Sequence, residues 1–146
     1  NFTFAIEGVS RSLLAQLTRH RHMSFSVQSQ RFVKFSSDSR SGGFDYVVPD
    51  DIAENHVGKD FDRFMIEVQN FYDYLIENGV PQEDARAVLP NAAATNLVMT
   101  ANLRSLLEFY EKRKPGNGAQ KEISQLAEEL KNRVIEVEPW TKEFFE

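Results

Sequence analysis

The side chains best suited to chemistry lie in one short segment near the start of the chain, residues 19–31, called here the cationic motif. Three arginines, two histidines and three serines fall within these thirteen residues, and no acidic residue lies between Glu7 and Asp38. A planar guanidinium group donates paired hydrogen bonds that match the oxygens of a phosphate. Serine hydroxyls and backbone N–H groups can complete such a site. The motif therefore predicts an anion-binding site, with phosphate as the anion that it fits best.

The cationic motif stands out because the chain as a whole is acidic. The chain has 17 basic and 22 acidic residues, a net charge of −5. An acidic chain that gathers its arginines in one segment favours a small anionic ligand over a solvated basic surface, which is the alternative for any run of charge. A nucleic-acid-binding module with a basic, aromatic-interleaved strand is a further alternative. The net charge argues against it, and we predict no nucleic-acid polymer as a partner.

Length and composition limit the class of protein. A chain of 146 residues fits a single domain, and its lack of cysteine excludes disulfides, cysteine-ligated metals and a thiolate nucleophile. The absence of cysteine agrees with a cytoplasmic location, which we predict. No apolar run approaches the roughly 18 residues of a membrane span, so we predict no membrane partner. Because the sequence does not begin with Met, we expect a fragment or a processed form that lacks an upstream segment.

In the first half, hydrophobic patterning indicates a few short elements around the cationic motif. Period-two alternation predicts a strand that is broken by Gly8, and apolar spacing of three and four predicts a helix that Ser10 caps. The motif is expected to continue as loop and strand. The predicted elements are a strand at 2–6, a helix at 10–19, a strand ending in the alternating residues 31–35, a polar loop at 36–43 and a strand at 45–48.

In the second half, helical periodicity dominates. Apolar spacing predicts three substantial helices, Gly79 ends the first of them, and Pro81 opens a short helix. The predicted elements are helices at 59–78, 81–88, 102–113 and 120–136, a strand at 97–100 and a break at 114–118. The predicted fold class is α+β, a small antiparallel or mixed sheet packed with several helices.

Other readings of the motif residues are weaker. His20 and His22 alternate along a segment expected to be extended, which would send them to opposite faces or to opposite sides of one pocket, and no third ligand lies nearby in the sequence. A histidine hydrogen-bonded or stacked beside a ligand is better supported than a metal site, and no metal is predicted. Ser29 lacks the Gly-x-Ser-x-Gly pattern of a nucleophile. Asn102 and Arg104, at the first turn of a predicted helix, are further anion-binding candidates.

Arg19-His20-Arg21, followed after seven residues by Ser29, resembles the Arg-His-Arg-x7-Ser signature of the flavin-dependent thymidylate synthases. The flanking sequences agree with that family. They are Phe-Thr-Phe-x-Ile-x-Gly-Val-Ser-Arg-Ser from Phe2, Ser-Gln-Arg-Phe from Ser29, Ala-Arg-Ala-Val-Leu-Pro-Asn from Ala85 and Asn-Leu-Arg-Ser-Leu from Asn102. The resemblance extends from Phe2 to Trp140. It implies the fold of the thymidylate synthase-complementing proteins, in one domain over residues 1–146 that lacks the N-terminal segment of the family.

The resemblance also implies an activity, the reductive methylation of dUMP to dTMP by a methyltransferase. Methylenetetrahydrofolate would supply the carbon, FAD would carry the hydride, and NADPH would reduce the flavin. The family forms homotetramers with active sites shared between subunits. Since the chain has no cysteine, the thiolate route of the other thymidylate synthases is closed, and an arginine that donates to a uracil carbonyl would activate the ring instead.

Site residues are implied by matching the motifs of the family. Arg113 would be catalytic, against the uracil, and Arg86 would act at the neighbouring subunit's site. The dUMP residues would be Gln16, Arg19, Val27, Gln28, Ser29, Gln30, Arg31, Arg86 and Arg113. The FAD residues would be Arg19, His20, Arg21, Val27, Asn102, Leu103, Arg104 and Glu108.

Three departures from the family pattern leave a second hypothesis open. Val27 stands where the family usually has Glu or Gln, and Glu108 where a neutral or basic residue is more common. The segment 115–120 lacks the histidine of the usual Ser-x-His-Ala-Gln. The alternative function is that of a non-catalytic relative that binds FAD and the nucleotide without methyl transfer.

Overall fold

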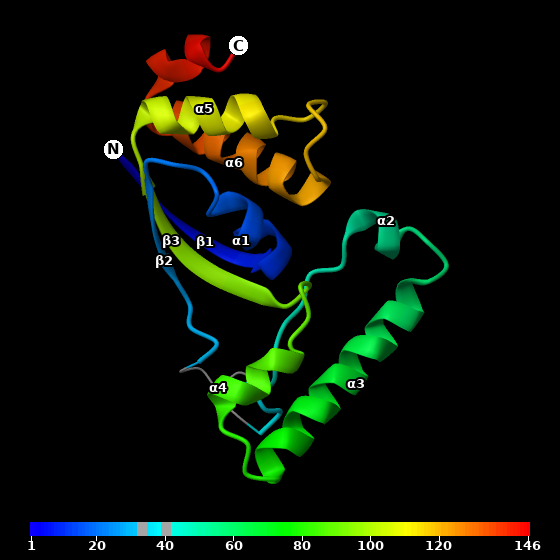
Figure 1. The fold of residues 1–146 in the computed structure, drawn as a ribbon. Helices are drawn as coiled ribbons and strands as arrows, with labels where there is room; N and C mark the ends of the chain where they lie inside the picture. The colour runs from blue at the N-terminus through cyan, green and yellow to red at the C-terminus, as the bar shows by residue number, and fades with distance from the viewer. Residues whose placement is uncertain (32–34, 39–41) are drawn as a thin grey trace. The chain divides into compact units, whose positions relative to one another are not determined.

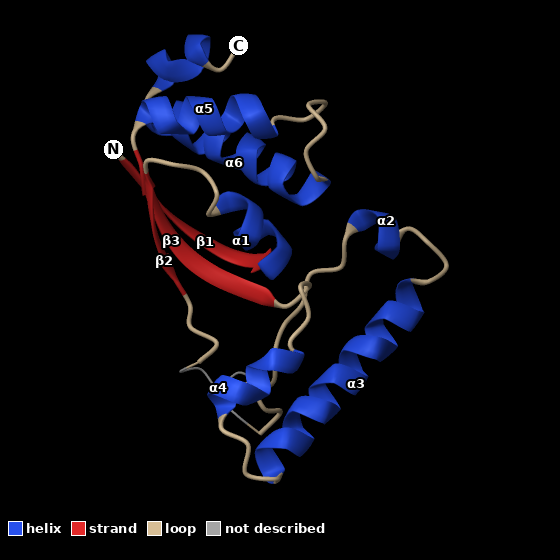
Figure 2. Ribbon diagram, in the orientation of Figure 1, coloured by secondary structure: helices blue, strands red, loops and turns tan. Residues whose placement is uncertain are grey.

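A computed structural model describes residues 1–31, 35–38 and 42–146. It confirms the predicted α+β class, since the described residues form a three-stranded sheet in the order β1-β3-β2 together with several helices (Figure 2). The strands are β1 (Phe2–Ser10), β2 (Met23–Val27) and β3 (Ala94–Ala101). By its contacts the chain divides into two compact units, which are described separately: unit 1 contains residues 1–6, 13–26 and 98–146, and unit 2 contains residues 7–12 and 27–97. The single domain over residues 1–146 stays a prediction.

The sheet is antiparallel, as two side-chain contacts between β1 and β3 show. The hydroxyls of Thr3 and Thr100 lie 2.9 Å apart, and the Gly8 N–H donates to the Asn96 side chain at 2.9 Å. Residue numbers therefore rise along one strand as they fall along the other. Every second residue of β3 is buried, as expected for a strand with one face on a core. The buried positions are Thr95, Leu97, Met99 and Ala101.

Three of the predicted boundaries around the motif are wrong. β1 does not break at Gly8 but runs to Ser10, because Gly8 adopts a φ of 68° and keeps a partner for its N–H on β3. α1 (Arg11–Leu17) is shorter than the predicted helix. The strand predicted in the motif is present as β2, but it ends at Val27 and does not continue to residues 31–35. Arg31 lies in a turn, and residues 32–34 lie outside the described residues.

The predicted strand at 45–48 is also wrong. Only Tyr46 pairs, through an isolated bridge to Ala93. Backbone hydrogen bonds on either side, from Val47 to the Ala92 carbonyl and from Ala94 to the Asp45 carbonyl, are both 2.8 Å long. Pro49 then leads into the short helix α2 (Asp50–Ala53), which the sequence analysis did not predict, and the pairing goes no further.

Unit 1 is built on helices with one buried face each. α5 (Leu103–Arg113) and α6 (Lys121–Val137) confirm the predicted helices and lie side by side (Figure 1). A short 3₁₀ segment, η2 (Pro139–Phe144), follows α6 and was not predicted. The largest side chains buried in this unit come from α1, β3, α5 and α6. They include Leu13, Leu17, Met99, Phe109, Ile123 and Val134.

Unit 2 is organised around α3 (Gly58–Glu77), which confirms the predicted long helix and ends before Gly79, at a φ of 83°. The predicted short helix is α4 (Gln82–Ala85) followed by the 3₁₀ turn η1 (Arg86–Val88), and it lies beside the C-terminal part of α3 (Figure 1). The buried residues of this unit's core are Phe35, Phe44, Met65, Tyr72, Ala85 and Ala93. Among the helices of the described ranges, none has the length and apolar character that crossing a membrane requires.

Candidate functional site

In unit 1, the first part of the cationic motif and one face of α5 line a pocket of about 400 Å³. The motif follows α1 in a turn, and its side chains meet those of α5 there. The pocket is lined by Arg19, His20, Arg21, His22, Ser105, Glu108, Phe109, Lys112 and Arg113. Four of these side chains are Arg or Lys and one is acidic, so the pocket suits an anion.

Helix geometry explains why α5 supplies so many of these residues. Ser105, Glu108, Phe109, Lys112 and Arg113 follow spacings of three and four, which put them on one helix face. Asn102 stabilises the N-terminus of α5 as its N-cap residue, because its Oδ1 accepts a hydrogen bond from the N–H of Ser105 at 2.9 Å. The side-chain oxygen of Asn102 therefore already accepts a hydrogen bond from the first turn of α5.

Arg113, the predicted catalytic residue, is held by two groups from the other side of the pocket. Its Nε donates to Nε2 of His20 at 3.0 Å, and its Nη2 lies 3.5 Å from the backbone oxygen of Gln16. His20 meets the edge of Phe109 at a centroid distance of 4.8 Å. Burial lowers the pKa of His20 from 6.5, and the nearby charges of Arg113 and Lys112 lower this pKa further. The neutral ring, with its proton on Nδ1, is the form that can accept from Arg113.

The expected extended conformation at His20 and His22 is wrong, whereas a placement of both rings around one pocket, one of the two arrangements that it allowed, agrees with the structure. Residues 20–22 form a bend before β2, and His22 has a φ of 62°, in the left-handed region. Both rings consequently line the same pocket. Among the described residues, no group of three or more His, Asp or Glu side chains is placed to hold a metal ion.

The remaining cations of this region differ in their partners. Arg104 pairs with Glu108 one turn later at 3.3 Å, and its side chain is 89% exposed. Arg19 and Arg21 make no ion pair with any residue in the described ranges. Arg104 thus partly compensates the charge of Glu108, whereas within the described ranges no carboxylate compensates Arg19 or Arg21.

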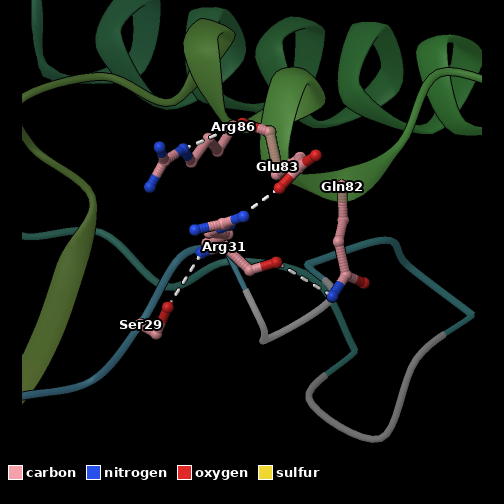
Figure 3. Close-up of polar contacts among 5 residues, drawn as sticks. All are labelled: Ser29, Arg31, Gln82, Glu83 and Arg86. Atoms are coloured by element: carbon pink, nitrogen blue, oxygen red, sulfur yellow. Dashed lines mark hydrogen bonds and ion pairs between the residues drawn. The ribbon is translucent and has the colours of Figure 1, made fainter.

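A second group of predicted residues lies in unit 2, around Arg31 (Figure 3). The Arg31 side chain donates to Glu83 at 2.7 Å, and its backbone N–H donates to the Ser29 hydroxyl at 3.1 Å. Gln82 donates to the Arg31 carbonyl at 3.0 Å. Arg86 begins the 3₁₀ turn η1 directly after the helix of Glu83, and its Nε donates to the Glu83 carbonyl at 2.9 Å. Arg31 therefore forms an ion pair with the carboxylate of Glu83. Like a phosphate, a carboxylate presents anionic oxygens that accept hydrogen bonds from a guanidinium group.

The other predicted residues are less distinctive. Val27, Gln28, Gln30 and Leu103 are half-buried, and the Gln28 N–H extends the sheet by donating to the Asn96 carbonyl at 2.9 Å. The predicted dUMP residues fall in both units. Gln16, Arg19 and Arg113 belong to unit 1, and the others belong to unit 2.

Comparison with known sequences decides the family. A family model described as thymidylate synthase complementing protein matches residues 1–140. The chain belongs to this family. It is 44% identical over 140 residues to the flavin-dependent thymidylate synthase of Geobacter sulfurreducens, a match that covers 95% of the chain and 58% of the relative.

Two further relatives carry the same name. The flavin-dependent thymidylate synthase of Nitratidesulfovibrio vulgaris is 48% identical over 122 residues, which cover 77% of the chain and 47% of the relative. That of Haloarcula marismortui is 35% identical over 165 residues, which cover 99% of the chain and 66% of the relative. The chain thus spans between about half and two thirds of the length of these relatives, and the family resemblance inferred from the cationic motif is confirmed.

The structure of this family member also places residues around the candidate site that the sequence did not indicate. Ser105, Phe109 and Lys112 line the unit 1 pocket, and Glu83 and Gln82 hold Arg31. The first three share the helix face of Glu108 and Arg113, so steps of three and four taken from both of these residues would have found them. No local pattern pairs Glu83 with a residue 52 positions earlier.

Proposed function

We propose that the chain carries the nucleotide and flavin site of a flavin-dependent thymidylate synthase, which methylates dUMP to dTMP. Methylenetetrahydrofolate donates the carbon, FAD is the cofactor, and NADPH is the reductant. The observation that carries the proposal is the fixed position of Arg113, between neutral His20 and the Gln16 carbonyl, in a pocket that Arg19 and Arg21 also line.

The chemistry of the unit 1 pocket fits a phosphate-bearing cofactor. Arg19, Arg21 and Lys112 offer positive charge, and Ser105 adds a hydroxyl. His20 lies beside α5, and Asn102, Leu103 and Arg104 lie at the start of that helix. Together with Val27 and Glu108, they are also assigned to FAD. When bound, the flavin supplies the hydride that turns the transferred one-carbon unit into a methyl group.

Arg113 is the residue assigned to ring activation. Uracil reacts at C5 when electron density moves into the ring, and this places negative charge on a carbonyl oxygen. The Nη1 group of Arg113, which has no partner among the described residues, can donate to that oxygen while His20 and Gln16 keep the guanidinium in place. A donor of this kind lowers the activation barrier by about 3–4 kcal/mol.

The phosphate of dUMP is assigned to the residues of unit 2. Ser29 and Arg31 come from the motif, and Arg86 comes from the adjacent turn η1. Glu83 presents a carboxylate to Arg31, and a phosphate would replace that contact with a more highly charged one. Because the family shares its sites between subunits, Arg86 is assigned to the site of a neighbouring subunit in a homotetramer, and the cytoplasm is the expected location.

Product formation tests the proposal. The purified chain is loaded with FAD and incubated with dUMP, methylenetetrahydrofolate and NADPH, and dTMP is separated by chromatography. We expect the protein to retain a yellow flavin spectrum and to form dTMP.

The same assay separates the second candidate function, which the departures at Val27 and in the α5–α6 loop favour. Binding of FAD and dUMP without any dTMP indicates a non-catalytic relative. Protein that retains no flavin and makes no dTMP contradicts both functions.

A further inference from the structure

We infer that Gln120 is a positioning residue, whose side chain fixes the amide of Gln16 against the nucleotide. The inference rests on the proposed function, since it assumes that Gln16 contacts dUMP. Its direct basis is one short hydrogen bond: the Gln16 Nε2 donates to the Gln120 Oε1 at 2.6 Å. Both residues belong to unit 1, although they lie 104 positions apart in the sequence.

Gln16 is held at two points by the two ends of the loop that joins α5 to α6. Arg113, the last residue of α5, approaches its backbone oxygen at 3.5 Å. Gln120, the N-cap residue of α6, accepts from its side chain. The loop from α5 to α6 thus connects Arg113, which is assigned to ring activation, with Gln120, which orients the Gln16 side chain.

The loop is built to keep this spacing. Lys114 donates its N–H to the Tyr110 carbonyl at 2.7 Å, and the Asn117 side chain donates to the Glu111 carbonyl at 2.7 Å. Gly116 and Gly118 adopt φ angles of 84° and 75°, which other residues rarely adopt. The segment that departs from the usual sequence of the family is therefore a compact turn closed onto α5.

Gln120 is anchored at its own backbone as well. Its carbonyl accepts the N–H of Ser124 at 3.1 Å in the first turn of α6, and Ser124 is buried. On the other side, Gln16 belongs to α1, whose Leu13 and Leu17 are fully buried. With both backbones fixed, the hydrogen bond sets the rotation of the Gln16 amide plane and hence the direction of its oxygen.

The experiment compares three single variants in the FAD-loaded full chain. Gln120→Leu removes the acceptor at similar size, whereas Gln120→Glu keeps an oxygen that can accept from Gln16. Gln125→Leu makes the matched change at an exposed position of the same helix. Affinity for dUMP is measured by calorimetry, and KM and kcat are measured by dTMP formation.

We expect Gln120→Leu to raise both Kd and KM for dUMP about three- to tenfold, the range for one lost hydrogen bond. Its kcat and its affinity for FAD should stay unchanged, because Arg113 keeps its own contacts. Gln120→Glu and Gln125→Leu should lie within about twofold of the wild type. In a Gln16→Leu background, Gln120→Leu should have no further effect, since it acts through Gln16.

Two outcomes overturn the inference while the proposed function stands: an active wild type whose dUMP affinity Gln120→Leu leaves unchanged, or a Gln120→Glu variant as weak as Gln120→Leu. A wild-type chain that does not bind dUMP overturns the proposed function together with the inference. Thermal unfolding of each variant shows whether a loss comes from the fold, and the Gln120→Glu variant tests the same contact if Gln120→Leu is unstable.

Discussion

The guanidinium of Arg113 has a defined orientation before any ligand arrives. One N–H group faces the Nε2 of His20, and a second faces the carbonyl of Gln16. A donor that is already oriented need not reorganise as charge develops on a substrate, which is the basis of electrostatic catalysis. At the residue scale, this preorganisation is the main support for the proposed reaction.

Replacing Arg113 by Ala is expected to abolish dTMP formation and to leave FAD bound, because Arg19 and Arg21 remain. Turnover and the flavin spectrum are measured in parallel. Arg133→Ala is a suitable control, since Arg133 is exposed on α6 and pairs with Glu129 and Glu136. An Arg113→Ala protein that turns over at the wild-type rate would reject the role assigned to Arg113.

His20 gives the molecule a predicted dependence on pH. Burial, Arg113 and Lys112 lower its pKa from 6.5 in the folded state. Below pH 6.5 the unfolded chain therefore takes up a proton that the folded chain resists, and the free energy of unfolding falls as the pH drops. The free energy of unfolding stops falling once the pH is below the pKa of His20 in the folded chain, and His20 causes no loss of stability above pH 6.5.

Two measurements check this dependence. Titration of the His20 ring by NMR should give a midpoint below 6.5, and Arg113→Ala should move that midpoint upward. Chemical denaturation should show the acid-side loss of stability in the wild type, and His20→Gln should lack this contribution. A midpoint at or above 6.5 would contradict the environment described for His20.

The residues that could be predicted are those whose type alone suggests their chemistry. Arginines spaced within the motif predicted an anion site, and the structure places Arg19 and Arg21 on a pocket with Arg113. The carboxylate partner of Arg31 could not be predicted, because Glu83 reaches it only through tertiary packing.

At the scale of elements, the residue at which α5 begins determines which of its side chains face the pocket. Asn102 caps the helix through the N–H of Ser105. Asn102→Ala should lower the free energy of unfolding by about 1 kcal/mol, while Asn102→Asp should keep most of the stability because Asp also caps. Chemical denaturation measures both, and equal stability of the Ala variant and the wild type would show that the cap is not needed.

The long helices were predictable because their apolar periodicity is sustained over several turns. α3, α5 and α6 match their predicted ranges within two residues. The short elements were not predictable, since a few local contacts decide them. Gly8 remains part of β1 because its N–H donates to the Asn96 side chain on β3. Residues 45–48 form a single β-bridge, at Tyr46, and not a strand.

At the scale of the whole molecule, the proposal requires more than one chain. Arg86 is assigned to the site of a neighbouring subunit, so an isolated chain would hold an incomplete nucleotide site. We expect light scattering coupled to size exclusion to give the mass of four chains. A monomer that turns over would contradict the shared site.

The account as a whole depends on the recognition of phosphate by arginines within an acidic chain of net charge −5. Calorimetric titration of the FAD-loaded chain with dUMP and, in parallel, with deoxyuridine tests this most directly. Each charge-assisted hydrogen bond contributes roughly 1.5–3 kcal/mol, so losing two should weaken binding at least about a hundredfold. We predict that dUMP binds and that deoxyuridine binds at least that much more weakly. Equal affinity for the two ligands would contradict the assignment of the motif to phosphate.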